Sequence, residues 1–267
     1  MKKTLVFLML FVFHLSLMAQ ELKICSWNIQ NFGKSKDEVE MAYIAKQVNQ
    51  FDLIAIQEVV ASVGGPQAVA RLADELNRMG SKWDYTISEP TTGKARERYA
   101  FLWRTSKVHK KADAWLEQKY EKQIEREPYF CRFIAGKTSF TLASFHAIPK
   151  SKQPATEIKY LKFLPARYPS DELVFCGDFN LPQTNNVFLP LKTMGYSPVL
   201  VGQKTSLKQA CVDDNCLASE YDNFFIRSSE WSVSKSGIVH FYRDFADVLR
   251  ARTISDHVPI FIQLNLN

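Results

Sequence analysis

The chain has 267 residues, of which 46% are hydrophobic and 23% are charged, with 10 glycines and 11 prolines. These proportions are typical of a globular protein, and they exclude a disordered chain, a collagen-like repeat and a polytopic membrane protein. The formal net charge of +6 favours anionic partners such as nucleic acids or phosphorylated small molecules, but it says nothing about the fold.

The first twenty residues are typical of a secretory signal peptide. Two lysines precede an apolar run over residues 5–18, and Ala19 is followed by polar Gln20. An uncleaved anchor is disfavoured because the run is shorter than the ~20 residues that a membrane-spanning helix needs. We therefore expect residues 1–19 to be removed, which leaves 248 residues with a charge of +4, and the protein to be exported, either to the periplasm or out of the cell.

Runs rich in β-branched, aromatic and aliphatic residues predict strands along the rest of the chain. In order, they lie at 22–27, 52–57, 99–103, 129–134, 139–146, 173–176, 221–226 and 258–264. Apolar residues at three- and four-residue spacing predict helices over 37–49 and 66–79. Residues 105–127 mix lysines with acids, which predicts a solvated loop or hairpin, with a binding strip as the alternative. The sequence has no internal linker or repeat, so we expect residues 20–267 to form one mixed α/β domain.

Export affects the interpretation of the five cysteines, because disulfides persist outside the cytosol. Cys25, Cys131 and Cys176 lie in strand-like runs, where a free cysteine behaves as a small buried apolar side chain. Cys211 and Cys216 lie five residues apart in a polar loop and are the best candidates for a disulfide. The absence of a Cys-x-x-Cys pattern disfavours a zinc site.

Several of the strand-like runs end in polar side chains that are capable of chemistry. These side chains are Asn28, Glu58, His146, Asp178 with Asn180, and Asp256 with His257. Because strand ends meet at one rim of a sheet, side chains distant in sequence can form one cluster there. Each residue alone would more often be a cap or a structural residue, but five such endings with complementary chemistry favour a functional site.

The oxygen donors in this set suit a hard divalent cation. Glu58, Asp178 and Asp256 offer carboxylates, and Asn28 and Asn180 offer amide groups. Such ligands favour Mg²⁺, with Mn²⁺ or Ca²⁺ as alternatives, over zinc. A cation of this kind serves phosphoryl chemistry, in which it neutralises charge on the phosphate oxygens.

The two histidines complete this chemistry. His146 and His257 can donate hydrogen bonds to phosphate oxygens or transfer protons, provided that a carboxylate fixes the tautomer of each ring. Glu97 and Asp222 are candidates for those carboxylates.

Together the motifs resemble the endonuclease/exonuclease/phosphatase superfamily, and within it the deoxyribonuclease I branch. Gly177-Asp178-Phe179-Asn180 and Ser255-Asp256-His257 are shared across the superfamily. Ser88-Glu89-Pro90, Glu97-Arg98-Tyr99 and Arg126-Glu127-Pro128 indicate the deoxyribonuclease branch. The resemblance extends over the chain from Leu22 to the C terminus.

The resemblance implies a four-layered α/β sandwich, in which two packed mixed β-sheets are flanked by helices, and metal-dependent hydrolysis of phosphodiesters. It implies that Glu58, with Asn28 and Asp256, holds a divalent ion. It implies that His257 paired with Asp222, and His146 paired with Glu97, lie beside the scissile phosphate. It also implies that Asp178 acts on the attacking water, Asn180 binds the phosphate and Arg126 contacts the DNA backbone.

The sequence also departs from the deoxyribonuclease branch at positions that contact DNA. Gln30 and Val60 stand where that branch has arginines, and Ala95 stands close to the position of a tyrosine. The resemblance therefore implies weaker or altered binding in the minor groove. The acidic calcium-binding segment of that branch is replaced here by a mixture of lysines and glutamates.

We expect an exported, Mg²⁺-dependent endonuclease that hydrolyses DNA with little sequence specificity, contacts the phosphate backbone, and acts as a monomer without stable membrane association. One alternative is a secreted phosphodiesterase or phosphatase of the same fold that acts on a phospholipid or another phosphoester. Trp231 and Phe241-Tyr242 are interspersed with polar residues, which disfavours a membrane-inserting hairpin. A catalytically inactive nucleic-acid-binding subunit is the third alternative, disfavoured because every expected catalytic residue is present.

Overall fold

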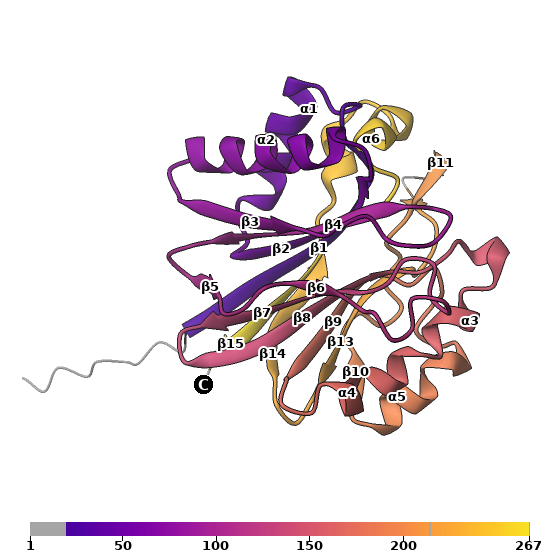
Figure 1. Cartoon of the computed structure of the whole chain (residues 1–267). Helices are drawn as coiled ribbons and strands as arrows, with labels where there is room; N and C mark the ends of the chain where they lie inside the picture. Colours follow the sequence, from indigo (N-terminus) through magenta and orange to yellow (C-terminus); the bar gives the residue numbers. More distant parts are fainter. Residues whose placement is uncertain (1–19, 214, 267) are drawn as a thin grey trace, which may run out of the picture.

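The computed structural model of the chain describes residues 20–213 and 215–266, so the predicted signal segment lies outside the described residues. Two mixed β-sheets pack against each other, and helices lie over the outer face of each sheet (Figure 1). This is the four-layered α/β sandwich that the family resemblance implies.

The first sheet has six strands in the order β14-β15-β1-β2-β4-β3. The strand bounds are β1 Gln20–Phe32, β2 Leu53–Val60, β3 Trp83–Ile87, β4 Glu97–Arg104, β14 Ser232–Ile238 and β15 Ile260–Leu266. β1 and β2 are parallel, and the other neighbours are antiparallel. On the same side of the molecule lie the helices α1 Glu38–Val48, α2 Gly64–Arg78 and α6 Val248–Ile254 (Figure 1).

The second sheet has the order β10-β13-β9-β8-β7-β5, with β6 paired to β7. The strand bounds are β5 Val108–Lys110, β6 Trp115–Leu116, β7 Tyr129–Ala135, β8 Thr138–His146, β9 Leu173–Asp178, β10 Tyr196–Pro198 and β13 Asp222–Arg227. β8 and β9 are its parallel pair. The helical segments beside it are η1 Lys150–Lys152, α3 Ala155–Ile158, η2 Leu161–Phe163, α4 Leu164–Arg167, η3 Asn186–Phe188 and α5 Leu189–Thr193.

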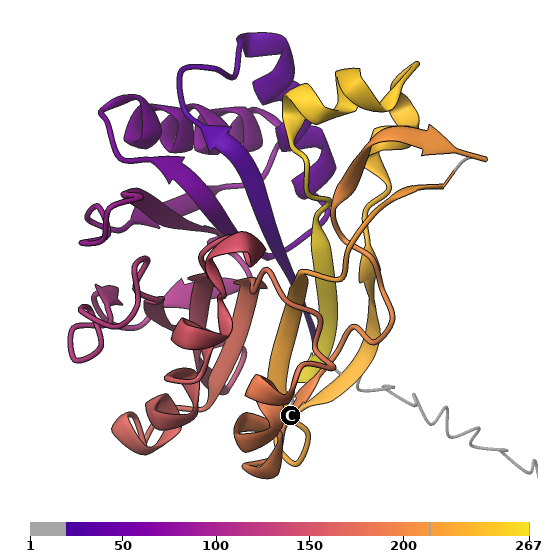
Figure 2. The same ribbon diagram turned by 90° about the vertical axis from the view of Figure 1, so that its right-hand side faces the viewer.

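A two-stranded ribbon projects from the sandwich beside α6 (Figure 2). Its strands are β11 Leu207–Val212 and β12 Asn215–Leu217, and the 3-10 helix η4 Phe241–Asp244 lies on the chain before α6. The disulfide between Cys211 and Cys216 joins the two strands of the ribbon. Cys25, Cys131 and Cys176 are free and buried.

The burial of each strand explains its composition. Every residue of β9 is buried, because it has a neighbouring strand on each side and both faces of the sheet are covered. Its sequence is accordingly an unbroken apolar run before Gly177. The layer between the sheets also contains a polar link. Gln57 Nε2 on β2 donates to Ser26 Oγ of its own sheet at 3.1 Å and to Ser144 Oγ of the opposite sheet at 2.7 Å.

All eight predicted strands and both predicted helices are present, but the prediction for residues 105–127 is wrong in part. This segment contains the short strands β5 and β6. Its second half is exposed at 118–119 and 121–123, as predicted, but it is anchored by buried residues on either side. Glu117 is buried, accepts a hydrogen bond from Tyr168 Oη at 2.6 Å and pairs with Arg167 at 3.1 Å. These contacts hold the segment against α4.

None of the helices in residues 20–213 and 215–266 has the length and apolar character that crossing a membrane requires.

Candidate active site

The polar side chains singled out in the sequence converge at one end of the two sheets. His146 ends β8, Asp178 ends the parallel strand β9, and Asp222 begins the antiparallel strand β13. The strand register places Asp178 beside both of the others. This end of the sandwich is opposite the end where Gln20 pairs with Leu266.

Asp178 is the centre of the cluster. Its carboxylate is 1% exposed, and Oδ2 lies 3.5 Å from His146 Nε2 and 3.6 Å from His257 Nε2. The same oxygen accepts hydrogen bonds from Asn28 Nδ2 at 3.1 Å and from Asn180 Nδ2 at 3.3 Å. One buried carboxylate therefore brings together two imidazoles and two amides that come from four separate parts of the chain.

A carboxylate lies against the Nδ1 atom of each histidine. His146 Nδ1 lies 2.8 Å from Glu97 Oε1, and His257 Nδ1 lies 2.7 Å from Asp222 Oδ2. A carboxylate at Nδ1 favours the proton on that nitrogen and holds the ring orientation, so that Nε2 faces the space beside Asp178. Both pairings expected from the sequence are thus present as hydrogen bonds.

Arg126 supports the first of these pairs from inside the protein. Its Nη1 lies 3.2 Å from Glu97 Oε2, its Nε donates to the carbonyl of His146 at 3.0 Å, and its Nη2 donates to the carbonyl of Ala147. The residue is 6% exposed. All three guanidinium nitrogens are engaged internally, which places Arg126 behind the Glu97–His146 pair, and the contact with the DNA backbone that the resemblance implies stays a prediction.

Two hydroxyl groups to which the sequence analysis assigned no role support the second pair. Thr205 Oγ1 donates to Asp222 Oδ2 at 2.6 Å and accepts from the Asp222 amide at 3.0 Å. Ser255 Oγ donates to the carbonyl of Asn28 at 2.6 Å and accepts from the His257 amide at 3.1 Å. The Ser-Asp-His motif contains Ser255, but no motif contains Thr205, because its contact depends on how the chain returns to β13.

The charges of the cluster determine the protonation of its members. Burial lowers the pKa of His257, but the carboxylates of Asp222 and Asp178 outweigh burial and raise that pKa well above its ordinary value. Burial and Arg126 lower the pKa of His146 and Glu97 raises it, with a net rise. Burial raises the pKa of Asp178, but the two histidines and the hydrogen bonds from Asn180 and Asn28 lower it overall.

Asn28 and Glu58 lie within their strands rather than at strand ends, which corrects the sequence interpretation. The register of β1 with β2 shifts after Asn28, and that of β2 with β4 shifts between Ile56 and Val59. Glu58 has a φ of +60° at this irregularity, and its Oε2 accepts from the Asn31 amide at 3.0 Å. Asn28 still pairs in register with Gln57 and reaches the cluster from within β1, which continues to Phe32, whereas the bulge redirects the side chain of Glu58.

The donor set fits a divalent cation. Asn28 Oδ1 is buried and has no hydrogen-bond partner in the described residues, so an oxygen ligand is available beside Asp178. Asp178, Asp222 and His257 offer ligand atoms within 4.8 Å of one another, and this buried group could also hold a metal ion. Asp256, the third expected ligand, lies 3.5 Å from Arg252.

Gly177 allows the end of β9 to approach β8. Its φ is +130°, and a Cβ atom there would lie 1.9 Å from the carbonyl oxygen of Phe145. Only glycine fits this position, which explains why glycine comes immediately before Asp178.

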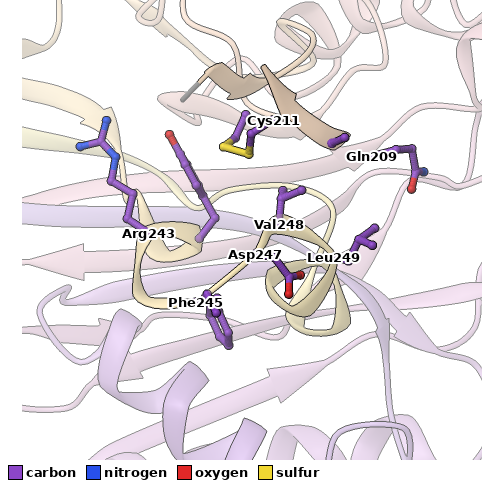
Figure 3. A pocket seen from close by; sticks show the side chains of 11 residues that line it. Gln209, Cys211, Arg243, Phe245, Asp247, Val248 and Leu249 are labelled. Carbon is purple, nitrogen blue, oxygen red and sulfur yellow. A yellow bond between two sulfur atoms is a disulfide. The ribbon is translucent and has the colours of Figure 1, made fainter. Parts of the chain in front are cut away.

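A separate pocket lies under the ribbon (Figure 3). It has a volume of about 700 Å³ and is lined by the Cys211–Cys216 disulfide, by Tyr242 and Arg243 of η4, and by residues 245–249 at the start of α6. None of the side chains clustered around Asp178 lines it, so this pocket is distinct from the candidate active site.

The fold and this cluster are those of a hydrolase built on an α/β sandwich. The chain belongs to the Endonuclease/Exonuclease/phosphatase family, which residues 25–257 match.

Curated relatives of the chain include three deoxyribonucleases. A protein named Deoxyribonuclease from Thioalkalivibrio sp. (strain K90mix) is 28% identical, and the match covers 91% of this chain and 70% of that protein. Deoxyribonuclease gamma of Rattus norvegicus is 28% identical over 92% of this chain and 85% of its own length. Deoxyribonuclease-1 of the same organism is 30% identical, and the match covers 61% of each protein.

Solved structures support the same fold. An endonuclease/exonuclease/phosphatase family protein from Bacteroides thetaiotaomicron matches with a TM-score of 0.69 and 17% identity, covering 93% of this chain and 98% of that chain. The mannosyl-6-phosphatase Bt3783 from Bacteroides thetaiotaomicron VPI-5482 matches with a TM-score of 0.63 and 18% identity, covering 92% of this chain and 100% of that chain. At these identities the likeness is one of fold.

Proposed function

We propose that this protein is an exported, divalent-metal-dependent endonuclease that hydrolyses phosphodiester bonds of DNA with little sequence specificity. The observation that supports this proposal most strongly is the buried carboxylate of Asp178 between the Nε2 atoms of two histidines, each of which is backed by its own carboxylate. The deoxyribonuclease relatives support DNA as the substrate.

The charges in the cluster suit attack by water on a phosphate. Asp178 has a lowered pKa and is ionised at neutral pH, so it accepts a hydrogen bond from the water and orients it toward phosphorus. His146 and His257 have raised pKa values and donate through Nε2 to the phosphate oxygens. Asn180 contributes an amide on the same side of the site, where its Nδ2 also donates to the Ala147 carbonyl at 3.0 Å.

In this arrangement, hydrolysis forms one bond to phosphorus and breaks another. The oxygen of water forms a bond to phosphorus as the ester bond to the departing nucleoside oxygen breaks. One imidazolium gives its Nε2 proton to the departing oxygen, and the Asp178 carboxylate that orients the water accepts the proton that the water releases. Glu97 and Asp222 keep the two rings in position during this exchange.

Glu58 and Asn28, with Asp256, are the residues proposed to hold a Mg²⁺ ion, with Mn²⁺ or Ca²⁺ as substitutes. When bound, such an ion neutralises negative charge on the phosphate as it builds up in the transition state. The unpaired Asn28 Oδ1 and the half-buried Glu58 carboxylate support this assignment over the buried Asp222, which is already occupied by His257 and Thr205.

The aromatic residues considered as a membrane-inserting element are buried in the structure. Trp231, Phe241 and Tyr242 are 7%, 1% and 8% exposed, and thus none of them is available to a lipid surface. This favours DNA over a phospholipid among the phosphodiester substrates.

Incubation of the purified protein with supercoiled plasmid and with labelled sphingomyelin, each with Mg²⁺ or with EDTA, tests the proposal. We expect plasmid cleavage in Mg²⁺, none in EDTA, and no release of the sphingomyelin headgroup. Intact plasmid together with headgroup release would replace the nuclease by the phospholipid-directed alternative.

We further propose that residues 1–19 are removed on export and that the mature protein acts as a monomer. N-terminal sequencing of protein recovered from the periplasm and the medium should begin at Gln20, and sedimentation should give the mass of one chain. Retention of Met1, or a dimer mass at micromolar concentration, would contradict these two points respectively.

A further inference from the structure

Three aromatic rings cluster on the helical side of the second sheet. The ring of Tyr120 lies 5.3 Å from that of Tyr160 and 5.8 Å from that of Phe163, and the latter two rings lie 6.3 Å apart. Phe163, on η2, is 43% exposed. Tyr120 and Tyr160 are half-buried, so the cluster leaves part of its aromatic surface exposed.

The ammonium group of a lysine lies over each of the three rings. The Nζ atoms of Lys119, Lys159 and Lys162 lie 5.6, 5.3 and 4.9 Å from the ring centres of their respective neighbours Tyr120, Tyr160 and Phe163. We call these six residues the lysine–aromatic patch. Cations and aromatic faces occur here together, rather than as separate basic and apolar surfaces.

The chain around the patch is strongly basic. Residues 148–169 contain five cationic residues, which are Lys150, Lys152, Lys159, Lys162 and Arg167. The single acid in this range, Glu157, is buried. Since the whole chain has a formal net charge of +6, a large share of its excess positive charge lies in this segment.

The patch is connected directly to the candidate active site. Glu157 lies two residues before Lys159, and its carboxylate accepts from the Ile148 amide at 3.0 Å and from the Glu125 amide at 2.6 Å. Ile148 follows the His146-Ala147 step, and Glu125 precedes Arg126. One buried carboxylate thus ties the segment that carries Lys159 to the segments that carry His146 and Arg126.

We propose that the lysine–aromatic patch binds an unpaired stretch of the DNA strand whose phosphate occupies the active site, an inference that rests on the proposed function. The lysines meet the phosphates, and movement of Lys162 from the Phe163 ring to a phosphate frees that ring to stack on a base. Bases in a duplex are stacked on one another, so only unpaired nucleotides can use that ring. A lipid surface is the other polyanion to consider, but insertion there would bury the three ammonium groups that cover the rings.

Fluorescence anisotropy with a single-stranded oligonucleotide and with the duplex of the same sequence tests this proposal. The full chain carries His257→Ala in all samples, so that the DNA stays intact. Phe163→Ala should weaken binding of the single strand at least about fivefold, the low end for loss of one stacked base, and change duplex binding less than about twofold. Phe163→Leu keeps the apolar volume without an aromatic face and should give the same loss.

The lysines are tested in the same background. Lys159→Glu with Lys162→Glu should weaken binding of both DNAs and lower the salt dependence, because two phosphate contacts are lost. Lys82→Glu with Lys107→Glu is the matched control. Both of these lysines are exposed at the opposite end of β4, and their replacement should leave single-strand affinity within about twofold.

Three outcomes would overturn the patch assignment. The first is single-strand affinity unaffected by either Phe163 variant, and the second is an equal loss for the control pair. The third is reduced binding of the patch variants to vesicles of phosphatidylcholine and phosphatidylserine with unchanged DNA binding. Plasmid cleavage by the wild-type protein is scored separately, so that the patch can fail while the nuclease proposal stands, and the reverse.

Discussion

The two histidine–carboxylate pairs of the site have nearly the same geometry but different surroundings. Nδ1 to carboxylate distances are 2.8 and 2.7 Å, and Nε2 to Asp178 distances are 3.5 and 3.6 Å. The pair with His146 includes the guanidinium of Arg126, which lowers the pKa of that imidazole. The charged groups that act on His257 are all carboxylates. The two imidazoles thus have similar geometry but different proton affinities, as expected if they have different catalytic roles at one phosphate.

The largest expected effect is on the rate of hydrolysis. His257→Ala and His146→Ala should each lower kcat for plasmid cleavage by about 10²–10⁴-fold, the range for a lost acid or base group. His109→Ala, at an exposed histidine of β5, is the control and should leave the rate unchanged. Near-normal rates in either of the first two variants would exclude that ring from the chemistry.

Removal of Arg126 should cost stability and also reduce the difference between the pairs. Arg126→Met leaves the Glu97 carboxylate buried without its cation, which should lower the free energy of unfolding by about 3–5 kcal/mol in urea titrations. The pKa of His146, followed by NMR of the imidazole, should rise because a cation that lowers it is gone. A loss under about 1 kcal/mol with no change in that pKa would show that Arg126 does not position this pair.

Metal binding should distinguish the carboxylate of Glu58 from that of Asp222. Calorimetry with Mn²⁺ and no substrate should show that Glu58→Gln weakens binding by at least about tenfold, the smaller end of the effects seen for groups around a metal. Asp222→Asn should have a smaller effect, because that carboxylate is occupied by His257 and Thr205. Asp84→Asn, at an exposed acid on β3, serves as the control. The reverse order would place the ion among Asp178, Asp222 and His257 instead.

The smallest effect concerns the pH dependence of stability. The pKa of His257 is raised in the folded state, so its stabilising contribution is complete below pH ~6.5 and is lost as pH rises through the folded pKa. Unfolding free energies measured in EDTA from pH 6 to 9 should therefore fall more steeply for wild type than for His257→Gln, by up to about 1.4 kcal/mol per pH unit. Parallel curves would indicate that His257 does not gain a proton on folding.

The sequence predicts much of the fold because buried strands have a strong apolar signal. β2 and β9 are covered on both faces and appear as continuous apolar runs. β14, with the sequence Ser-Val-Ser-Lys-Ser-Gly-Ile, was missed because it is an edge strand with mostly exposed side chains. The ribbon strand β11 was missed for the same reason, since most of its residues are exposed.

The sequence predicts those residues of the site that belong to recognisable motifs. Asp178, His146 and His257 were identified because each belongs to or ends a recognisable run, and the structure brings them within 3.6 Å of a common oxygen. Thr205 and the internal role of Arg126 could not be predicted, because both depend on contacts between elements far apart in the chain. The bulge at Glu58 also requires the register of three strands, which the sequence of β2 alone does not contain.

The central claim is that the cluster around Asp178 hydrolyses phosphodiester bonds with the help of a divalent ion, and cleavage of supercoiled plasmid by Asp178→Asn tests it most directly. Wild-type protein should relax and linearise plasmid in Mg²⁺, EDTA should stop the reaction, and Asp178→Asn should lower the rate by at least about 10²-fold with an unchanged circular dichroism spectrum. Cleavage by Asp178→Asn at the wild-type rate, or plasmid left intact by wild-type protein in Mg²⁺, would contradict the account.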